Sequence, residues 1–348
     1  ALVSARRPEQ DSRIAVTGGP IGVSVPEHLY PPLMLSYANE GVFDGIDAPT
    51  LESTYGYPIK ADSPWEALAG WREAELAFEV LGRSGRQGTS LGCVGLASTE
   101  LAQLSAASHG GFRPIDRHYV AMLGELKTNY HMLSKVVHVT RIRGLMQTFY
   151  NPIYGGFVGG AEGVAVACVA GPLLMNQLYM ASTYGARPEH PFLNTNSTPE
   201  ILWALSVAFQ GVTRNTNLML HATAGPAGGP GTKTILQENA AISIAGATSG
   251  ASMIAASMSA CGTNAMHASG LDAKICGEIA RSIGGMSREE GNMIVTRLVD
   301  LYLEDLQNKP IGKRFEEVYN LETIEPTSEW LGTYDEVKNE LEKFGFNI

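Results

Sequence analysis

The stretch STPEILWALSVAFQGVTRNTNLMLH, from Ser197 to His221, contains one complete helix–strand unit. Ser197-Thr-Pro-Glu200 is a helix start signal, because hydroxyl residues precede a proline that fits the first helical turn. The segment that follows from Ile201 has a helical pattern, and Asn217–His221 is a short strand-like run. This unit predicts one helix followed by one strand.

The same alternation continues along most of the chain. Ser63 and Pro64 predict a helix that opens at Trp65, and helical periods also cover Thr232–Ala247 and Leu271–Ile283. Eight short apolar runs are the predicted strands: Ile14–Thr17, Gly45–Ala48, Thr89–Val94, Phe112–Asp116, Leu145–Phe149, Phe192–Asn194, Asn217–His221 and Met253–Met258.

We therefore predict an α/β fold, a parallel (β/α)8 TIM barrel with additional helices, rather than two ordinary domains. The fourth strand has an alternative placement, because Tyr119–His138 could hold a strand followed by a helix. We assign residues 1–287 to the barrel and residues 288–348 to a helical segment packed on it, where the composition becomes charged. The start at Ala1, without a methionine, leaves open whether a natural N-terminal portion precedes it.

The bulk composition excludes several classes of partner. A net charge of −10 argues against nucleic acid and anionic membrane surfaces, because binding phosphates requires clustered lysines and arginines. The longest apolar run, Val164–Met175, is too short and too interrupted by glycine and proline to span a bilayer. No signal peptide is visible, so we expect a cytoplasmic protein.

Cysteine spacing gives no sign of a metal centre. Cys93, Cys168, Cys261 and Cys276 lie far apart and form no CxxC motif. We expect buried thiols in a reducing compartment and no zinc or iron–sulfur site from neighbouring ligands.

Two glycine-rich stretches fail as nucleotide motifs. In Ala224–Lys233 a threonine separates the last glycine from the lysine, which a phosphate-binding loop does not allow. Gly155–Gly160 lacks the GxGxxG spacing of a dinucleotide site. A loop after a strand is the simpler interpretation of both.

Polar residues at predicted strand ends are the candidates for chemistry, because barrels place their active sites there. Asp116-Arg-His118 follows the predicted fourth strand, and we take Asp116 and His118 as catalytic candidates. A purely structural role is the alternative for His118. Asn194 and His221 end two further predicted strands.

Several short motifs occur in one order along nearly the whole chain. They are Gly18-Gly-Pro-Ile-Gly22, Ser36-Tyr-Ala38, Asp116-Arg-His118, Asn151-Pro-Ile-Tyr-Gly-Gly-Phe-Val-Gly-Gly160, Asn196-Ser-Thr-Pro-Glu200, Gly277-Glu-Ile-Ala-Arg281, Gly312-Lys-Arg-Phe-Glu-Glu-Val-Tyr319 and Glu325-Pro-Thr-Ser-Glu-Trp330. In content and order they resemble the monomethylamine:corrinoid methyltransferases of methylotrophic methanogens. The N-terminal region of that family has no counterpart here.

The resemblance implies a barrel that transfers a methyl group from an amine to Co(I) of a corrinoid on a separate protein. The family carries pyrrolysine near the end of its third strand, and an ungapped match between Gly85 and Gly111 puts Gly92 at that position. Acidic family positions around the pyrroline ring correspond to Tyr119 and Phe149. The positions of a glutamine and a tyrosine correspond to Thr223 and Gly225.

These joint changes suggest a pocket rebuilt for another methylated amine, most simply a quaternary one. Gly92 would open the pocket, and Tyr119 and Phe149 would offer ring faces to a cation, at about 0.5–2 kcal/mol each. The other candidate pocket residues are Tyr150, Tyr154, Asn194, His221 and Thr223. The alternative is that the aromatic rings only fill the space that the long residue left.

We expect no cofactor bound tightly by this chain, no metal ligands, a corrinoid protein as partner and a homo-oligomer. A methoxy or methylthio donor is an alternative substrate. A barrel that binds a methylated amine without turnover is the alternative from a different functional class.

Overall fold

A closed barrel of eight parallel strands forms the centre of the computed structural model, which describes residues 14–84, 89–91, 100–109, 113–255, 259–346 and 348. The barrel strands are β1 Ala15–Gly18, β3 Gly45–Asp47, β7 Thr89–Leu91, β8 Arg117–Met122, β9 Leu145–Tyr150, β10 Thr183–Ala186, β11 Leu220–Thr223 and β12 Met253–Ala255. The barrel closes because β1 pairs in parallel with both β12 and β3. The predicted (β/α)8 barrel is confirmed.

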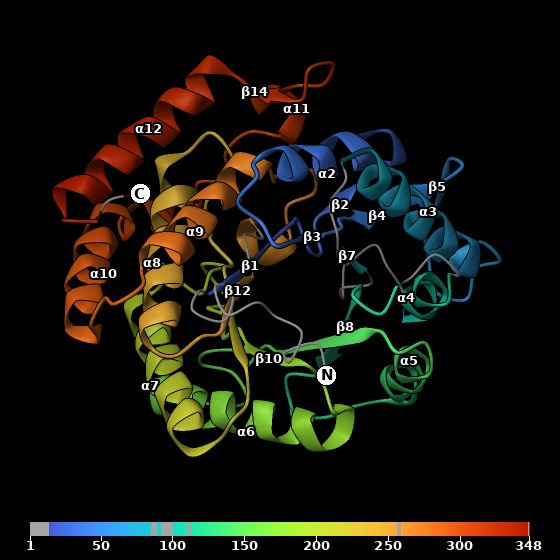
Figure 1. Ribbon diagram of the computed structural model, residues 1–348, viewed down its shortest axis with the longest axis horizontal. Coiled ribbons are helices and arrows are strands. Elements are labelled where there is room, and N and C mark those ends of the chain that lie inside the picture. Colours follow the sequence, from blue (N-terminus) through green and yellow to red (C-terminus); the bar gives the residue numbers. More distant parts are fainter. Residues whose placement is uncertain (1–13, 85–88, 92–99, 110–112, 256–258, 347) are drawn as a thin grey trace.

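Helices surround the strands on all sides (Figure 1). They are α2 Tyr30–Asn39, α3 Glu66–Ser84, α4 Glu100–Ala107, α5 Tyr130–Arg141, α6 Ala161–Tyr179, α7 Pro199–Asn215, α8 Lys233–Thr248 and α9 Gly270–Ser282. Outward-facing strand residues such as Val120, Tyr150 and Leu220 are fully buried and belong to the main hydrophobic core. This core fills the space between barrel and helices.

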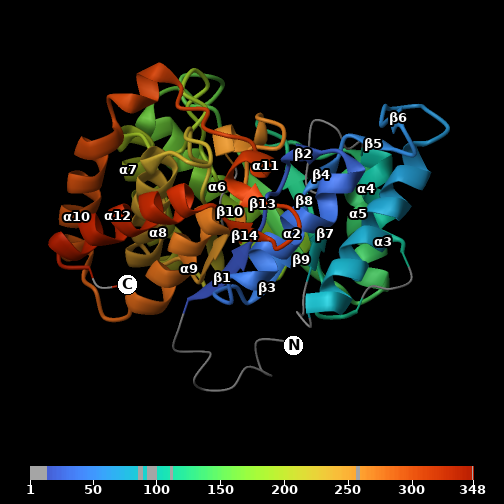
Figure 2. The ribbon, with the colours of Figure 1, turned by 90° about the horizontal axis from the view of Figure 1, so that it is seen from above.

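Further elements follow the barrel in the sequence. They are α10 Arg288–Tyr302, α11 Phe315–Val318, β13 Tyr319–Asn320, β14 Glu325–Pro326 and α12 Ser328–Lys343. Both α10 and α12 contact α8, and both views show them outside α8 and α9 (Figures 1 and 2). The division into residues 1–287 and 288–348 stays a prediction.

Short elements complete the described part of the chain. The two-stranded pairs are β2 Ser24–Val25 with β4 Thr50–Leu51, and β5 Ser53–Thr54 with β6 Tyr57–Pro58. The 3-10 helices are Glu27–Leu29, Ser259–Gly262 and Asp305–Asn308.

The two predicted start signals lie at or next to observed helix starts, and the helical period predicted from Thr232 also corresponds to a helix. Pro199 opens α7 after Thr198, and the Thr232 side chain caps α8 by accepting a hydrogen bond from the N–H of Ile235 at 3.3 Å. Helix α3 begins at Glu66, one residue later than the predicted Trp65.

The fourth strand is not Phe112–Asp116. Arg113 and Asp116 instead form a turn, in which the N–H of Asp116 donates to the Arg113 carbonyl at 2.9 Å. The Asp116 carboxylate also accepts from the N–H of Arg113 at 2.7 Å. Strand β8 therefore begins at Arg117, and the alternative of a strand and helix in this region, β8 and α5, is the one observed.

The sixth strand is not Phe192–Asn194. Strand β10 covers Thr183–Ala186, whereas Phe192 lies in the following loop with its side chain 78% exposed. Gly185 and Ala186 weakened the strand signal of β10, and the apolar residues of the loop gave a misleading one.

Two of the four cysteines have described side chains. Cys168 and Cys276 are buried and free, as predicted. Cys93 and the side chain of Cys261 lie outside the described residues.

Helix α6 extends beyond the apolar run Val164–Met175 at both ends and is long and apolar enough to cross a membrane by length and composition alone, contrary to the prediction from the run itself. In the structure α6 contacts α7, β9 and β10.

Candidate active site

Side chains that alternate along each strand divide the barrel into an interior and an outer face. On β8, Val120 belongs to the core between strands and helices, whereas Tyr119 belongs to a small separate cluster inside the barrel. This interior cluster consists of Ile21, Tyr119, Ala121 and Phe149.

The strand register arranges the interior residues in layers from the N-terminal to the C-terminal end of the barrel. Arg117 lies in the lowest layer, and Gln147 and His221 lie above it. The next layer holds Asp47, Tyr119 and Gly185, and the layer above it, toward the C-terminal mouth, holds Phe149 and Thr223.

Tyr119 and Phe149 form an aromatic pair on the neighbouring strands β8 and β9. Their ring centroids are 5.5 Å apart at an interplanar angle of 78°, an edge-to-face contact. The Tyr119 hydroxyl accepts a hydrogen bond from Gln147 Nε2 at 2.6 Å, which fixes the orientation of the tyrosine. Both rings are buried inside the barrel, and Phe149 lies nearer the mouth.

His221 lies in the middle of the barrel, inside β11 and not at the strand end predicted from Asn217–His221. Its ring is 6.5 Å from that of Tyr119, at 81°. A Cβ atom on Gly185 would lie only 2.2 Å from His221 Nε2, so the imidazole occupies the space that this glycine leaves open. Burial and then the charge of Arg117 lower the pKa of His221 to about 3, which keeps the ring neutral at neutral pH.

A buried ion pair lies beside these rings. Arg117 donates to Asp47 Oδ1 at 2.8 Å, and the Asp47 side chain is fully buried. Burial raises the pKa of Asp47, and the charge of Arg117 opposes that shift. Sequence reasoning missed Asp47 as a site residue, although its alternation with Gly45 in a predicted strand would have put it on the interior face.

Two predicted catalytic residues lie away from the interior. Asp116 precedes β8, at the end of the strand opposite the mouth, and its carboxylate is bonded to Arg113. His118 is on the outer face of β8, where its ring meets Gly144 and where burial and then Lys135 of α5 lower its pKa to about 3. The prediction that these residues follow a strand is wrong, because the strand starts after Asp116.

Two predicted substrate-binding residues also lie elsewhere. Tyr150 faces outward, packs on Gly171 of α6 and donates its hydroxyl to the Gly124 carbonyl at 2.9 Å. Asn194 lies in the loop after β10 with a φ of 50°, and not at a strand end. Gly92 lies outside the described residues.

Tyr154 lies in the loop after β9, outside the strands. Its ring stacks on His190 with centroids 5.5 Å apart. This contact joins the loop after β9 to the loop after β10.

Asn196 joins the loops around the mouth, a role that its sequence motif did not reveal. Its Nδ2 donates to the Thr223 carbonyl at 2.7 Å, and its Oδ1 accepts from the N–H of Gly225 at 2.8 Å. Thr223 is the last residue of β11, as a mouth residue should be.

Glu238 of α8 forms hydrogen bonds with the loops after β10 and β11. Its carboxylate accepts four hydrogen bonds at 2.7–2.8 Å, from the hydroxyls of Thr195 and Ser197 and the N–H groups of Ala227 and Gly228. Burial raises the pKa of Glu238, and these hydrogen bonds oppose the shift.

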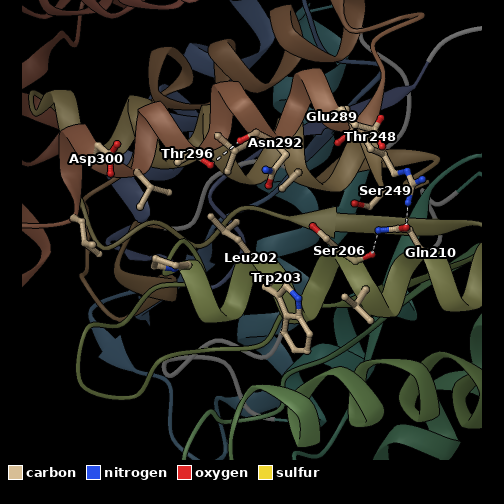
Figure 3. A pocket seen from close by; sticks show the side chains of 17 residues that line it. Leu202, Trp203, Ser206, Gln210, Thr248, Ser249, Glu289, Asn292, Thr296 and Asp300 are labelled. Carbon is tan, nitrogen blue, oxygen red and sulfur yellow. Dashed lines mark hydrogen bonds between the residues drawn. The ribbon is translucent and has the colours of Figure 1, made fainter.

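A groove of about 610 Å³ lies outside the barrel, between α7 and α10 (Figure 3). Leu202 and Trp203 line it from α7, and Asn292 and Thr296 line it from α10. It contains none of the predicted site residues. The barrel interior therefore remains the candidate active site. Among the described residues no group of three or more His, Cys, Asp or Glu side chains could hold a metal ion.

Comparisons with known proteins agree with the barrel and its motifs. The family model described as monomethylamine methyltransferase MtmB matches residues 1–346. MtmB2 of Methanosarcina acetivorans is 30% identical over 330 residues, which cover 95% of this chain and 72% of that protein. MtmB1 of Methanosarcina barkeri is 31% identical over 332 residues, with the same coverage.

Solved structures give the same result. The crystal structure of the Methanosarcina barkeri monomethylamine methyltransferase MtmB superposes with a TM-score of 0.92 at 30% identity, covering 97% of this chain and 74% of that one. The hydroxylamine complex of MtmB matches equally well, with a TM-score of 0.92. The chain therefore belongs to the monomethylamine methyltransferase MtmB family and is a methyltransferase.

Proposed function

We propose that this chain is a pyrrolysine-independent methyltransferase that moves a methyl group from a quaternary amine to the corrinoid of a separate protein. The observation that carries the proposal is the edge-to-face pair of Tyr119 and Phe149 inside the barrel. Aromatic faces attract a quaternary ammonium, which offers no N–H to a hydrogen-bond acceptor.

The chemistry of the donor favours a quaternary amine. When the C–N bond breaks, its electron pair goes to the nitrogen, so a quaternary ammonium leaves as a neutral amine without first gaining a proton. The corrinoid supplies the nucleophile that forms the new bond to the methyl carbon. The protein then needs only to position the cation, exclude water and present one methyl group at the mouth.

The match of Gly92 to the pyrrolysine position supports independence from that residue. A glycine offers no side chain that could activate monomethylamine covalently. It also leaves room for a larger ammonium ion.

The remaining parts of the proposal concern context. We propose that the chain is cytoplasmic, forms a homo-oligomer and acts on a corrinoid protein. We propose no tightly bound cofactor for the chain itself. Membership of the MtmB family supports the corrinoid partner.

Methyl transfer tests the proposal directly. The purified chain is mixed with a corrinoid reduced to the Co(I) state and with one donor at a time: tetramethylammonium, monomethylamine, a methoxy compound or a methylthio compound. The absorbance change of cobalt methylation should appear with tetramethylammonium. Transfer only from the methoxy or methylthio compound would assign the alternative donor class. Binding without transfer from any donor would mean a binding protein.

A further inference from the structure

Buried polar atoms around the aromatic pair have no hydrogen-bond partner in the described part of the chain. They are Nδ1 and Nε2 of His221, Oε1 of Gln147 and Oγ1 of Thr223. Buried polar groups in native proteins are nearly always paired, and an unpaired one costs about 1–3 kcal/mol. A set of such atoms on one interior wall therefore points to a ligand.

The register brings these atoms together. His221 and Thr223 are two residues apart on β11, so their side chains share the interior face. Gln147 lies in the same layer as His221 and is tied to Tyr119 by its amide nitrogen, which leaves its Oε1 as an acceptor. The Thr223 hydroxyl thus lies level with Phe149, on the mouth side, and the polar atoms of His221 and Gln147 lie deeper in the barrel.

Together the three side chains offer both donors and acceptors. A neutral imidazole carries one N–H donor and one acceptor nitrogen, a threonine hydroxyl can do either, and the free oxygen of Gln147 only accepts. A ligand group that both donates and accepts, such as a hydroxyl or a primary amide, satisfies this set.

A carboxylate suits the same wall less well. Asp47 lies in the layer of Tyr119, and its Oδ2 has no hydrogen-bond partner in the described residues. The nearby cation, Arg117, already donates to Asp47. An anionic group would approach a buried carboxylate and the acceptor oxygen of Gln147.

We propose that the quaternary substrate carries a short neutral arm with a hydroxyl or amide group, which His221, Gln147 and Thr223 bind while Tyr119 and Phe149 hold the ammonium. This inference rests on the proposed function. The arm points down into the barrel, so that a methyl group on the opposite side of the nitrogen faces the mouth.

Isothermal titration with matched ligands tests the arm on the unmodified chain. The ligands are tetramethylammonium and the trimethylammonium ions that carry a 2-hydroxyethyl, an n-propyl or a carboxymethyl arm. The 2-hydroxyethyl ion should bind about three- to tenfold more tightly than the n-propyl ion of the same size, as one net hydrogen bond allows. It should also bind more tightly than the carboxymethyl ion.

Thr223→Val tests whether the Thr223 hydroxyl binds the arm, because valine keeps the shape of threonine and removes the hydroxyl. The ratio of n-propyl to 2-hydroxyethyl dissociation constants should fall toward one in this variant. Thr248→Val, in the helix layer, is the matched control and should keep the ratio of the unmodified chain. Thermal unfolding of both variants checks that they are folded.

Three results would overturn the inference. Equal affinity for the 2-hydroxyethyl and n-propyl ions would mean that buried water satisfies the polar atoms. Tightest binding of the carboxymethyl ion would mean that Arg117 accepts an anionic arm. An unchanged ratio in Thr223→Val would place the arm elsewhere. Failure of every quaternary ion to bind would instead refute the proposed function itself.

Discussion

The Phe149 ring has no hydrogen-bonding group, whereas the Tyr119 hydroxyl accepts a hydrogen bond from Gln147. Phe149→Leu keeps most of the apolar volume and removes the aromatic face. We expect affinity for a quaternary ammonium to fall by about 0.5–2 kcal/mol, or about two- to thirtyfold. Isothermal titration with tetramethylammonium measures the loss.

The control for this substitution is Tyr130→Leu, which removes a ring that is 87% exposed on α5. Titration with the neutral tert-butyl isostere separates charge from shape. If the isostere binds as tightly as the cation, or Phe149→Leu binds like the unmodified chain, the rings only fill space.

Gly185 leaves the space that the His221 ring occupies. Gly185→Ala would put a methyl group 2.2 Å from His221 Nε2, so the ring or the strand must shift. We expect a loss of about 1–3 kcal/mol in the free energy of unfolding, together with weaker ligand binding. Urea denaturation measures the first effect.

Gly211→Ala is the matched control, because its new Cβ would have its nearest neighbour, in Val169, at 3.7 Å. This position is inside helix α7, where alanine is favoured over glycine by about 1 kcal/mol. Equal stabilities of Gly185→Ala and the unmodified chain would show that His221 is free to move.

At the scale of elements, helices followed from the sequence better than strands did. Helix starts depend on local chemistry, such as the Thr232 cap of α8. Strand limits depend on pairing with distant segments. Strand β10 contains Gly185, because a side chain there would collide with His221 of the next strand. The same glycine weakens the local strand pattern in the sequence.

Glu238 connects the loops after β10 and β11 through α8. Glu238→Gln replaces one acceptor oxygen by an NH2 group that faces donors. We expect the free energy of unfolding to fall by about 1–3 kcal/mol and the substrate KM to rise, because the mouth loops lose their common anchor. Urea denaturation and steady-state kinetics measure these effects.

The control is Glu336→Gln, which removes an ion-pair partner of Lys233 at an exposed position. Exposed ion pairs contribute at most about 1 kcal/mol, so this variant should unfold like the unmodified chain. A Glu238→Gln variant with unchanged stability and KM would show that the loops need no such anchor.

For the molecule as a whole, the sequence located the barrel and part of its interior. Four predicted pocket residues lie on interior faces: Tyr119, Phe149, His221 and Thr223. His221 was predicted from a strand end, and the other three were predicted from the family resemblance. The Asp47–Arg117 pair was not predicted as a pair. Its partners are 70 residues apart, and only the closure of the barrel brings them together.

Donor choice is a property of the whole enzyme. On the proposed match of Gly92 to the pyrrolysine position, monomethylamine should give no cobalt methylation above background, while a quaternary amine should give it. Spectroscopic assay of the purified chain with both donors measures this. Robust transfer from monomethylamine would show that the barrel activates the small amine in another way.

Four buried groups with large pKa shifts contribute to the pH dependence of the stability of the molecule. Burial is the largest cause of every shift: it lowers the pKa of His118 and His221 to about 3, and it raises the pKa of Glu73 to about 8 and that of Asp272 to about 7. The histidines bind fewer protons in the folded state, and the carboxyl groups bind more.

The signs follow from these proton counts. Between pH about 3 and 6.5 the unfolded histidines take up protons that the folded ones do not, so the histidine contribution is lost as pH falls. Between pH about 4.5 and 8 the folded carboxyl groups keep protons that the unfolded ones release, so their contribution is lost as pH rises. For each group the free energy of unfolding changes by about 1.4 kcal/mol per pH unit. Between pH about 4.5 and 6.5 the contributions of the two histidines and the two carboxyl groups have opposite signs and nearly cancel. We therefore expect maximal stability in that range.

Urea denaturation from pH 3 to 8 measures the curve, and His118→Phe tests the origin of its acid limb. This variant removes one outward-facing buried histidine, so the decline below pH 4.5 should become shallower while the decline above pH 6.5 stays. The exposed His28 provides the control, because His28→Gln leaves every buried group in place. A stability that still rises from pH 6.5 to 8 would mean that Glu73 and Asp272 are not held protonated in the folded barrel.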